Sequence, residues 1–237
     1  MSTFEKPAAG AFNREHMSVA FAIDTSSSLS NEAMRNINAN FNRFKDIVCQ
    51  DERAARCVDV AVVSFADRVA VEQDWCPVAD LRRIELSQAG CTDLNGGVLK
   101  AATMIREHSG QYNSAGIIEK KPYLIIMTDG MDTITGNVDE AADFVVPRER
   151  EGKLKVFFLG FDDYDRATAA QLTAGSGSRV FEVVDGDYNF NDFFDYAANS
   201  VKAASVSAVG DKISVNTPIG TSDSNIAAVD LDSWLNS

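Results

Sequence analysis

Short apolar runs alternate with longer amphipathic segments along most of this chain. The apolar runs at 17–24, 57–66, 123–128, 155–160 and 179–184 are typical of buried strands. After the first run, apolar residues recur at steps of three and four, which predicts a helix over 31–48 carrying Met34, Ile37, Phe41 and Phe44 on one face. Further helices are predicted directly after residue 93, over 138–146 and 166–174, and around the Phe-rich segment 190–201.

This alternation predicts an α/β fold, with a doubly wound, mainly parallel sheet and helices on both faces, as in Rossmann-like proteins. The segment 67–73 alternates polar and apolar residues, so we predict one antiparallel edge strand there, followed by a long surface loop over 74–90. The predicted domain spans 15–206. It follows an N-terminal tail, 1–14, and precedes a polar segment, 207–237, that we predict to be a flexible C-terminal tail.

Polar residues interrupt the apolar pattern where the first strand ends. Asp24, Ser26 and Ser28 stand at alternate positions directly after the run 18–23. Each polar group buried at such a place needs a partner. Mg²⁺ takes oxygen ligands in an octahedral array, and hydroxyls held in a tight loop can supply two of them.

Two later segments carry polar residues of the same kind. Thr92 and Asp93 precede a predicted helix, and Asp129 ends the strand 123–128. In a doubly wound sheet, ligands bind where neighbouring strands send their helices to opposite faces. An alternative for each single segment is helix capping, which we expect for Asp93 and which could also explain Asp24, Ser26 and Ser28. We predict that Asp132 is a solvated turn residue.

These three segments, in this order, resemble a von Willebrand factor type A (VWA) domain with its metal-ion-dependent adhesion site (MIDAS). The resemblance covers roughly 15–206. It implies that Ser26, Ser28 and Thr92 coordinate the metal directly, while Asp24 and Asp129 act directly or through water. The implied cofactor is Mg²⁺ or Mn²⁺. Two carboxylates balance one divalent ion and leave it able to take an Asp or Glu side chain from a protein partner, which favours recognition over catalysis.

Within that family, the later part of the chain is similar to bacterial intracellular VWA proteins of the tellurium and toxic-anion resistance type. The similar segments are 164–172, 181–187 and 191–207. This likeness implies a role in a stress-response or defence complex. It also implies partners such as a protein kinase or a protein phosphatase of the same operon.

Two other functions remain open from the sequence. An apolar strand ending in Asp24 also resembles a haloacid-dehalogenase-type phosphohydrolase, in which that Asp would be the nucleophile. That chemistry requires a second Asp two residues later, where this chain has Ser26. A VWA subunit of an ATPase or chelatase complex is the other alternative. The two histidines, His16 and His108, do not follow strand ends, so we expect no Ser-His-Asp enzyme.

Composition narrows the class of partner. The 237 residues are 45% hydrophobic and 24% charged, as in an ordinary globular protein. A net charge of −13 argues against nucleic acid or an anionic membrane as a partner. No signal peptide is visible, and the four cysteines show no metal-binding spacing. We therefore expect free thiols and a cytoplasmic location.

Overall fold

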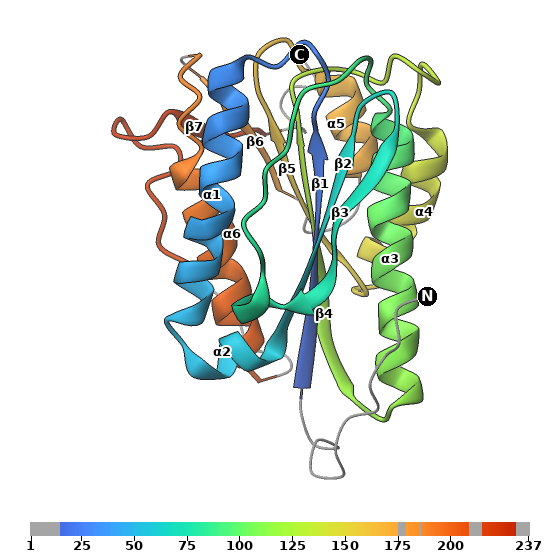
Figure 1. Ribbon diagram of the computed structural model, residues 1–237, viewed down its shortest axis with the longest axis vertical. Helices are drawn as coiled ribbons and strands as arrows, with labels where there is room; N and C mark the ends of the chain where they lie inside the picture. Colours follow the sequence, from blue (N-terminus) through green and yellow to red (C-terminus); the bar gives the residue numbers. More distant parts are fainter. Residues whose placement is uncertain (1–14, 175–178, 185, 209–214, 231–237) are drawn as a thin grey trace.

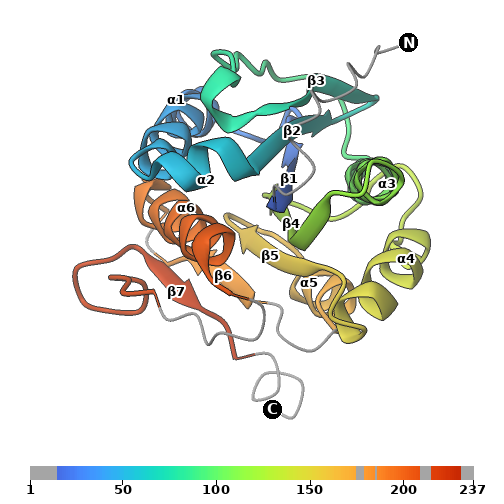
Figure 2. The same ribbon diagram turned by 90° about the horizontal axis from the view of Figure 1, so that it is seen from below.

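The computed structural model describes residues 15–174, 179–184, 186–208 and 215–230. Its centre is a seven-stranded sheet in the order β3-β2-β1-β4-β5-β6-β7. Helices cover both faces (Figures 1 and 2). The strands are β1 (Glu15–Asp24), β2 (Val58–Phe65), β3 (Val69–Pro77), β4 (Ile118–Thr128), β5 (Lys155–Gly160), β6 (Arg179–Val183) and β7 (Ile226–Ala228).

The central strands run parallel, as predicted. β1 pairs in parallel with β2 on one side and with β4 on the other, and β4, β5 and β6 continue the parallel pairing. The predicted antiparallel edge strand is β3, which pairs with β2. β7 forms a second antiparallel edge by pairing with β6. The α/β, doubly wound fold with helices on both faces is therefore confirmed.

One face of the sheet is covered by α1 (Asn31–Cys49), α2 (Glu52–Cys57) and α6 (Asn191–Val206). Its core is aromatic. Phe21 of β1 packs edge-on against Phe41 and Phe44 of α1 at centroid distances of 5.2 and 5.1 Å, and stacks on Phe194 of α6 at 6.0 Å. These are the inward positions of the predicted helical pattern, so the periodicity identified the core correctly.

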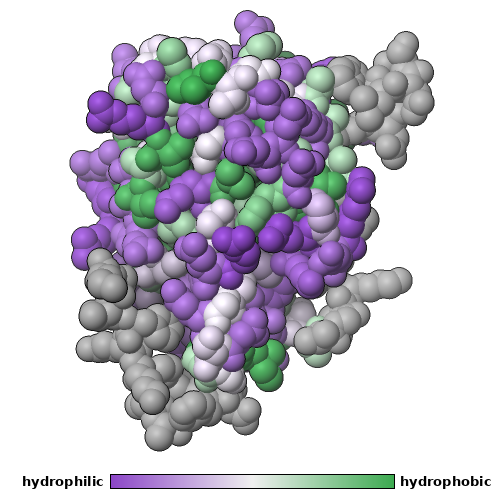
Figure 3. Space-filling model, turned by 90° about the vertical axis from the view of Figure 1, so that its right-hand side faces the viewer, coloured by the Kyte–Doolittle hydropathy of each residue, from purple (hydrophilic) through white to green (hydrophobic). Residues whose placement is uncertain are grey.

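The opposite face is covered by α3 (Leu94–Ser114), α4 (Asp139–Arg150) and α5 (Arg166–Leu172). Smaller side chains allow α3 to approach the sheet closely. A Cβ atom at Gly97 would lie 2.3 Å from the ring of Phe65, so only glycine fits at this contact. The outer surface on the side of α3 and α4 is mostly hydrophilic, with small apolar areas between the polar side chains (Figure 3).

The structure differs from the sequence-based expectations at several boundaries. The segment 74–90, predicted as a surface loop, continues β3 to Pro77 and then forms the short 3-10 helix η1 (Val78–Asp80). The rest of it is anchored, because Leu81, Ile84 and Leu86 are buried in the core. β7 lies within the segment predicted as a C-terminal tail. Residues 1–14, predicted as an N-terminal tail, lie outside the described residues.

Within the described ranges, none of the helices combines the length and the apolarity that crossing a bilayer requires. All four cysteines are free thiols, as expected.

Candidate functional site

The carboxyl end of β1 places Asp24 inside the protein. Its side chain is fully buried, and both oxygens are used. Oδ1 accepts a hydrogen bond from the backbone N–H of Ser26 at 2.8 Å, and Oδ2 accepts one from the hydroxyl of Thr128 at 2.6 Å. Burial raises the pKa of Asp24, and these hydrogen bonds, which favour the ionised form, partly offset that effect.

The carboxyl end of β4 brings Asp129 to the same place. Ser28 Oγ donates to Asp129 Oδ1 at 3.1 Å, and Ser26 Oγ lies 3.5 Å from the same oxygen. The two serine hydroxyls are 2.8 Å apart. Asp24, Ser26, Ser28 and Asp129 thus form one hydrogen-bonded cluster, although 101 to 105 positions separate Asp129 from the other three in sequence.

Negative charge accumulates in this cluster. Burial and then the charge of Asp24 raise the pKa of Asp129 to about 6. Asp162, after β5, contributes further repulsion. Two buried carboxylates that repel each other are stabilised by a nearby cation, because its charge offsets both desolvation and repulsion.

Thr92 is not hydrogen-bonded to the cluster in the described part of the chain, and its backbone is held by the loop after β4. Its N–H donates to Thr133 Oγ1 at 2.9 Å, and its carbonyl accepts from Thr133 N–H at 2.9 Å, which ties the start of α3 to the loop after β4. The segment before it is tied to the serine loop, because Gly90 O accepts from Ser27 N–H at 3.0 Å. Thr92 is 4% exposed. In the described part of the chain, its hydroxyl forms no hydrogen bond with Asp24, Ser26, Ser28 or Asp129.

Helix capping does not account for the serine loop. The cap of α1 is Ser30, whose hydroxyl accepts from Ala33 N–H at 3.0 Å. Asp24, Ser26 and Ser28 are directed at each other and at Asp129 instead. Asp93 is a cap, as predicted, because its carboxylate accepts from Gly96 N–H at 2.8 Å at the start of α3.

The prediction for Asp132 was wrong. It is 4% exposed, and its carboxylate accepts five hydrogen bonds: four from Ile134, Thr135 and Gly136 in its own loop, and one from Asn95 N–H in α3. Burial opposes ionisation, but these donors outweigh it and hold the pKa of Asp132 below its usual value. The local signal was an Asp followed by Thr-Ile-Thr-Gly, a sequence typical of a side chain that caps its own turn.

Sequence reasoning also missed residues that border the cluster. Thr128 orients Asp24, as described above. Asp162 has a φ of +53° in the left-handed region, and its carboxylate accepts hydrogen bonds from Tyr188 Oη at 3.1 and 3.0 Å. A signal was present, since Asp162 closely follows the apolar strand 155–160, as Asp24 and Asp129 follow theirs.

The donor set fits a hard divalent cation better than a soft one. It consists of carboxylate and hydroxyl oxygens, which Mg²⁺ and Mn²⁺ prefer. No group of three or more His, Cys, Asp or Glu side chains suited to a metal occurs among the described residues. Any ion bound here therefore depends on hydroxyls for part of its coordination.

Comparison with known proteins agrees with this architecture. The sequence profile of the von Willebrand factor type A domain matches residues 18–196, about three quarters of the chain. No curated protein sequence matches the chain significantly.

Several solved structures share the fold. Proximal thread matrix protein 1 from the mussel byssus has a TM-score of 0.55 at 19% identity, over 81% of this chain and 47% of that protein. The von Willebrand factor type A protein from Catenulispora acidiphila has a TM-score of 0.58 at 15% identity, over 80% and 43%. Pilus adhesin SpaC from Lactobacillus rhamnosus GG has a TM-score of 0.61 at 12% identity, over 80% and 30%. The chain spans less than half the length of each, and at these identities the likeness shows the fold alone.

Proposed function

The chain belongs to the von Willebrand factor type A domain family, and on that premise we propose that it is a divalent-metal-dependent protein-binding module. Domains of this family are typically modules for protein interaction or adhesion. The proposed site consists of Asp24, Ser26, Ser28, Thr92 and Asp129, with Mg²⁺ or Mn²⁺ as the ion. It takes an Asp or Glu side chain from a partner protein.

The observation that carries this proposal is the hydrogen-bonded cluster at the carboxyl ends of β1 and β4. The helix after β1 packs on one face of the sheet and the helix after β4 on the other, so the cluster lies at the topological switch point where α/β sheets bind ligands. Asp24 and Asp129 supply two negative charges, and the hydroxyls supply neutral oxygens. A bound divalent ion supplies an electrophilic position for a carboxylate.

The burial and hydrogen bonding of the Asp24 carboxylate support binding of a partner protein over phosphohydrolase chemistry. A nucleophilic carboxylate needs a free oxygen directed at the substrate. Asp24 is fully buried, and both of its oxygens accept hydrogen bonds. Ser26 stands where that mechanism requires a second acid.

The cellular setting is proposed from the sequence likeness of the later segments. We place the chain among tellurium and toxic-anion resistance-type VWA proteins of the bacterial cytoplasm, in a stress-response or defence complex. The partner that supplies the acidic residue is then a protein kinase or phosphatase of the same operon. A VWA subunit of an ATPase or chelatase complex is the alternative, and affinity capture in Mg²⁺ and in EDTA distinguishes the two by the class of protein retained.

Metal binding is tested by thermal unfolding. At about one hundred times Kd, a ligand of the native state adds about 2.7 kcal/mol. For a domain of this size we therefore expect Mg²⁺ or Mn²⁺ to raise Tm by about 5–10 °C over the value in EDTA. Asp129→Asn and Ser28→Ala should abolish or strongly reduce this response.

Ser27→Ala is the matched control, because the Ser27 hydroxyl donates to Gly90 O at 2.8 Å and not to the cluster. It should keep the full metal response. A wild-type Tm that is the same in Mg²⁺, Mn²⁺ and EDTA would contradict the proposal. An equal loss of response in Ser27→Ala would show that loop integrity, and not the ligand set, is being measured.

A further inference from the structure

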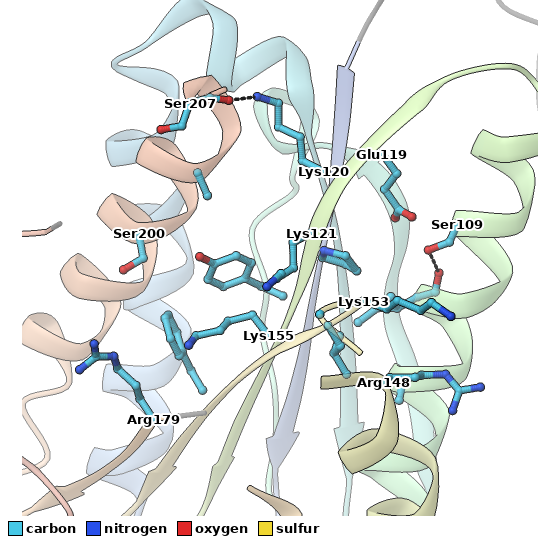
Figure 4. A pocket seen from close by; sticks show the side chains of 18 of the residues that line it. Ser109, Glu119, Lys120, Lys121, Arg148, Lys153, Lys155, Arg179, Ser200 and Ser207 are labelled. Atoms are coloured by element: carbon cyan, nitrogen blue, oxygen red, sulfur yellow. Dashed lines mark hydrogen bonds between the residues drawn. The ribbon is translucent and has the colours of Figure 1, made fainter. Parts of the chain in front are cut away.

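A large basic cavity lies at the opposite end of the sheet from the candidate metal site. It has a volume of about 970 Å³ and opens between α3, α4 and α6 at the amino ends of β4 and β5 (Figure 4). Lys and Arg supply seven of its lining residues, and Glu119 is the single acidic one. This concentration of positive charge is unexpected in a chain with a net charge of −13. The volume is in the range of sites for small molecules.

Four of the seven cations form a salt bridge or lie over the ring of Phe144. These are Lys120, paired with Glu15 at 3.0 Å, Lys153, paired with Glu151 at 2.8 Å, and Arg106 and Arg148, which lie over the ring of Phe144 at 5.1 and 3.6 Å.

The remaining three are Lys121, Lys155 and Arg179, and they form no salt bridge with any described residue. They lie in a row from β4 to β6, on the side of the cavity that faces α6 (Figure 4). Burial lowers the pKa of Lys155. The nearby carboxylate of Glu149 opposes this, while the charges of Arg179 and Lys121 lower it further. The three cations of this row therefore repel one another, and a bound anion would relieve that repulsion.

Aromatic rings form the wall beside these cations. Tyr123, Phe157 and Tyr196 are in contact, with centroid distances of 5.3 Å from Tyr123 to Phe157 and 5.4 Å from Phe157 to Tyr196. Lys155 Nζ lies 5.9 Å from the centroid of the Phe157 ring. Ser200 of α6 lies across from the row (Figure 4). We call this side of the cavity, formed by Lys121, Lys155, Arg179, Tyr196 and Ser200, the lobe. It combines cations, a hydroxyl and an apolar surface within one concave space.

We propose that this lobe binds an organic phosphate, that is, a small molecule with at least two negative charges on phosphate groups and an aromatic or apolar body. The guanidinium of Arg179 suits bidentate contact with phosphate oxygens, and Lys121 and Lys155 supply point charges. The half-buried ring of Tyr196 packs against the body, and the buried rings of Tyr123 and Phe157 support it from behind. An acidic peptide needs a long groove, so a concave space of about 970 Å³ favours the small molecule.

This site is independent of the proposed metal site. Lys121 lies near the start of β4 and Asp129 directly follows its end. At about 3.3 Å per residue, the two positions are ~26 Å apart along the strand. An anion held at Lys121 therefore cannot reach an ion held by Asp129.

The test is calorimetric titration with ADP, pyrophosphate and adenosine, in EDTA so that no divalent metal takes part. We expect ADP to bind more tightly than pyrophosphate, because only ADP has a base that can pack against the aromatic rings. We expect adenosine, which has no phosphate, to bind at least tenfold more weakly than ADP. Lys155→Gln and, separately, the exposed Arg179→Gln should each weaken ADP binding about tenfold, the loss typical of one charge-assisted hydrogen bond. The matched control is Lys100→Gln on the exposed surface of α3, outside the cavity, and it should change the affinity less than about twofold.

Any of four results would overturn the proposal. The first is the absence of detectable binding of both ADP and pyrophosphate at about 5 mM, a concentration that reveals even millimolar affinity. The second is an equal affinity for ADP in wild type, Lys155→Gln and Arg179→Gln. The third is binding of poly-glutamate by the wild type in preference to both phosphates, which would assign the cavity to an acidic peptide. The Asp129→Asn variant should bind ADP as the wild type does. The fourth result is a loss of ADP binding in this variant, which would place the phosphate at the proposed metal site instead of the basic cavity.

Discussion

At the residue scale, one buried carboxylate outside both proposed sites holds three rings together. Asp59 of β2 accepts a hydrogen bond from Tyr112 Oη, and its Oδ2 lies 3.3 Å from His16 Nδ1 and 3.5 Å from His108 Nε2. His108 is also stacked on Trp75 at 4.4 Å. Burial raises the pKa of Asp59, but the contacts with His108, His16 and Tyr112 outweigh burial and hold that pKa well below its usual value.

Asp59→Asn should therefore cost about 2–3 kcal/mol of unfolding free energy at pH 7, as for other broken buried polar networks. A depressed pKa in the folded state stabilises the protein above the unfolded value of about 3.9, and this stabilisation is lost as pH falls through the lower folded value. The difference between wild type and variant should shrink as pH falls below about 3.9. Urea unfolding at these pH values measures it, with the exposed Asp80→Asn as a control that should stay within about 0.5 kcal/mol of wild type. A difference that does not shrink between about pH 4 and pH 2 would contradict this account.

At the element scale, β7 shows how a polar segment without a regular pattern joins the sheet. It is three residues long, yet Ile226 is 1% exposed and belongs to the core on the face of α1 and α6. Val184 N–H and Val229 N–H donate to backbone carbonyls across the β6–β7 pair, which covers the otherwise open edge of β6. One buried side chain and the backbone hydrogen bonds with β6 thus hold β7 in the sheet.

Ile226→Ala should destabilise the protein by about 2–4 kcal/mol, because it leaves a cavity in the core. A flexible tail predicts a change within about 0.5 kcal/mol instead. Chemical unfolding separates the two outcomes. Ser222→Ala, at an exposed position of the same segment, is the control and should change stability by less than about 0.5 kcal/mol. Equal stabilities of wild type and Ile226→Ala would show that β7 contributes nothing in solution.

At the scale of the whole molecule, charge is distributed unevenly along the strands. Acidic residues exceed basic ones, 35 to 22, and the carboxyl ends of β1, β4 and β5 carry Asp24, Asp129 and Asp162. The basic cavity lies at the amino ends. Most exposed ion pairs contribute little to stability, so the net repulsion dominates the long-range electrostatics.

Raising NaCl from about 20 to about 200 mM in EDTA should therefore increase Tm by about 2–4 °C, since it shortens the screening length from roughly 20 Å to roughly 7 Å. Thermal unfolding by circular dichroism measures the shift. KCl at the same ionic strength is the control and should give the same curve, because screening does not depend on the identity of the cation. A fall in Tm with salt would mean that local ion pairs outweigh the net repulsion.

The sequence by itself determined the fold class, because the alternation of apolar runs and 3.6-residue periodicity is a local property of the chain. It also identified Asp24, Ser26, Ser28 and Asp129 as a possible group, since each follows an apolar strand in an order that resembles a VWA domain. The tertiary structure decided what depends on contacts between distant segments. Ser30, and not the residues before it, caps α1. Asn95 of α3 donates to the buried carboxylate of Asp132, and Ile226 brings β7 into the sheet. The basic cavity also required the fold, because Lys121, Lys155 and Arg179 belong to three strands and meet only when those strands pair.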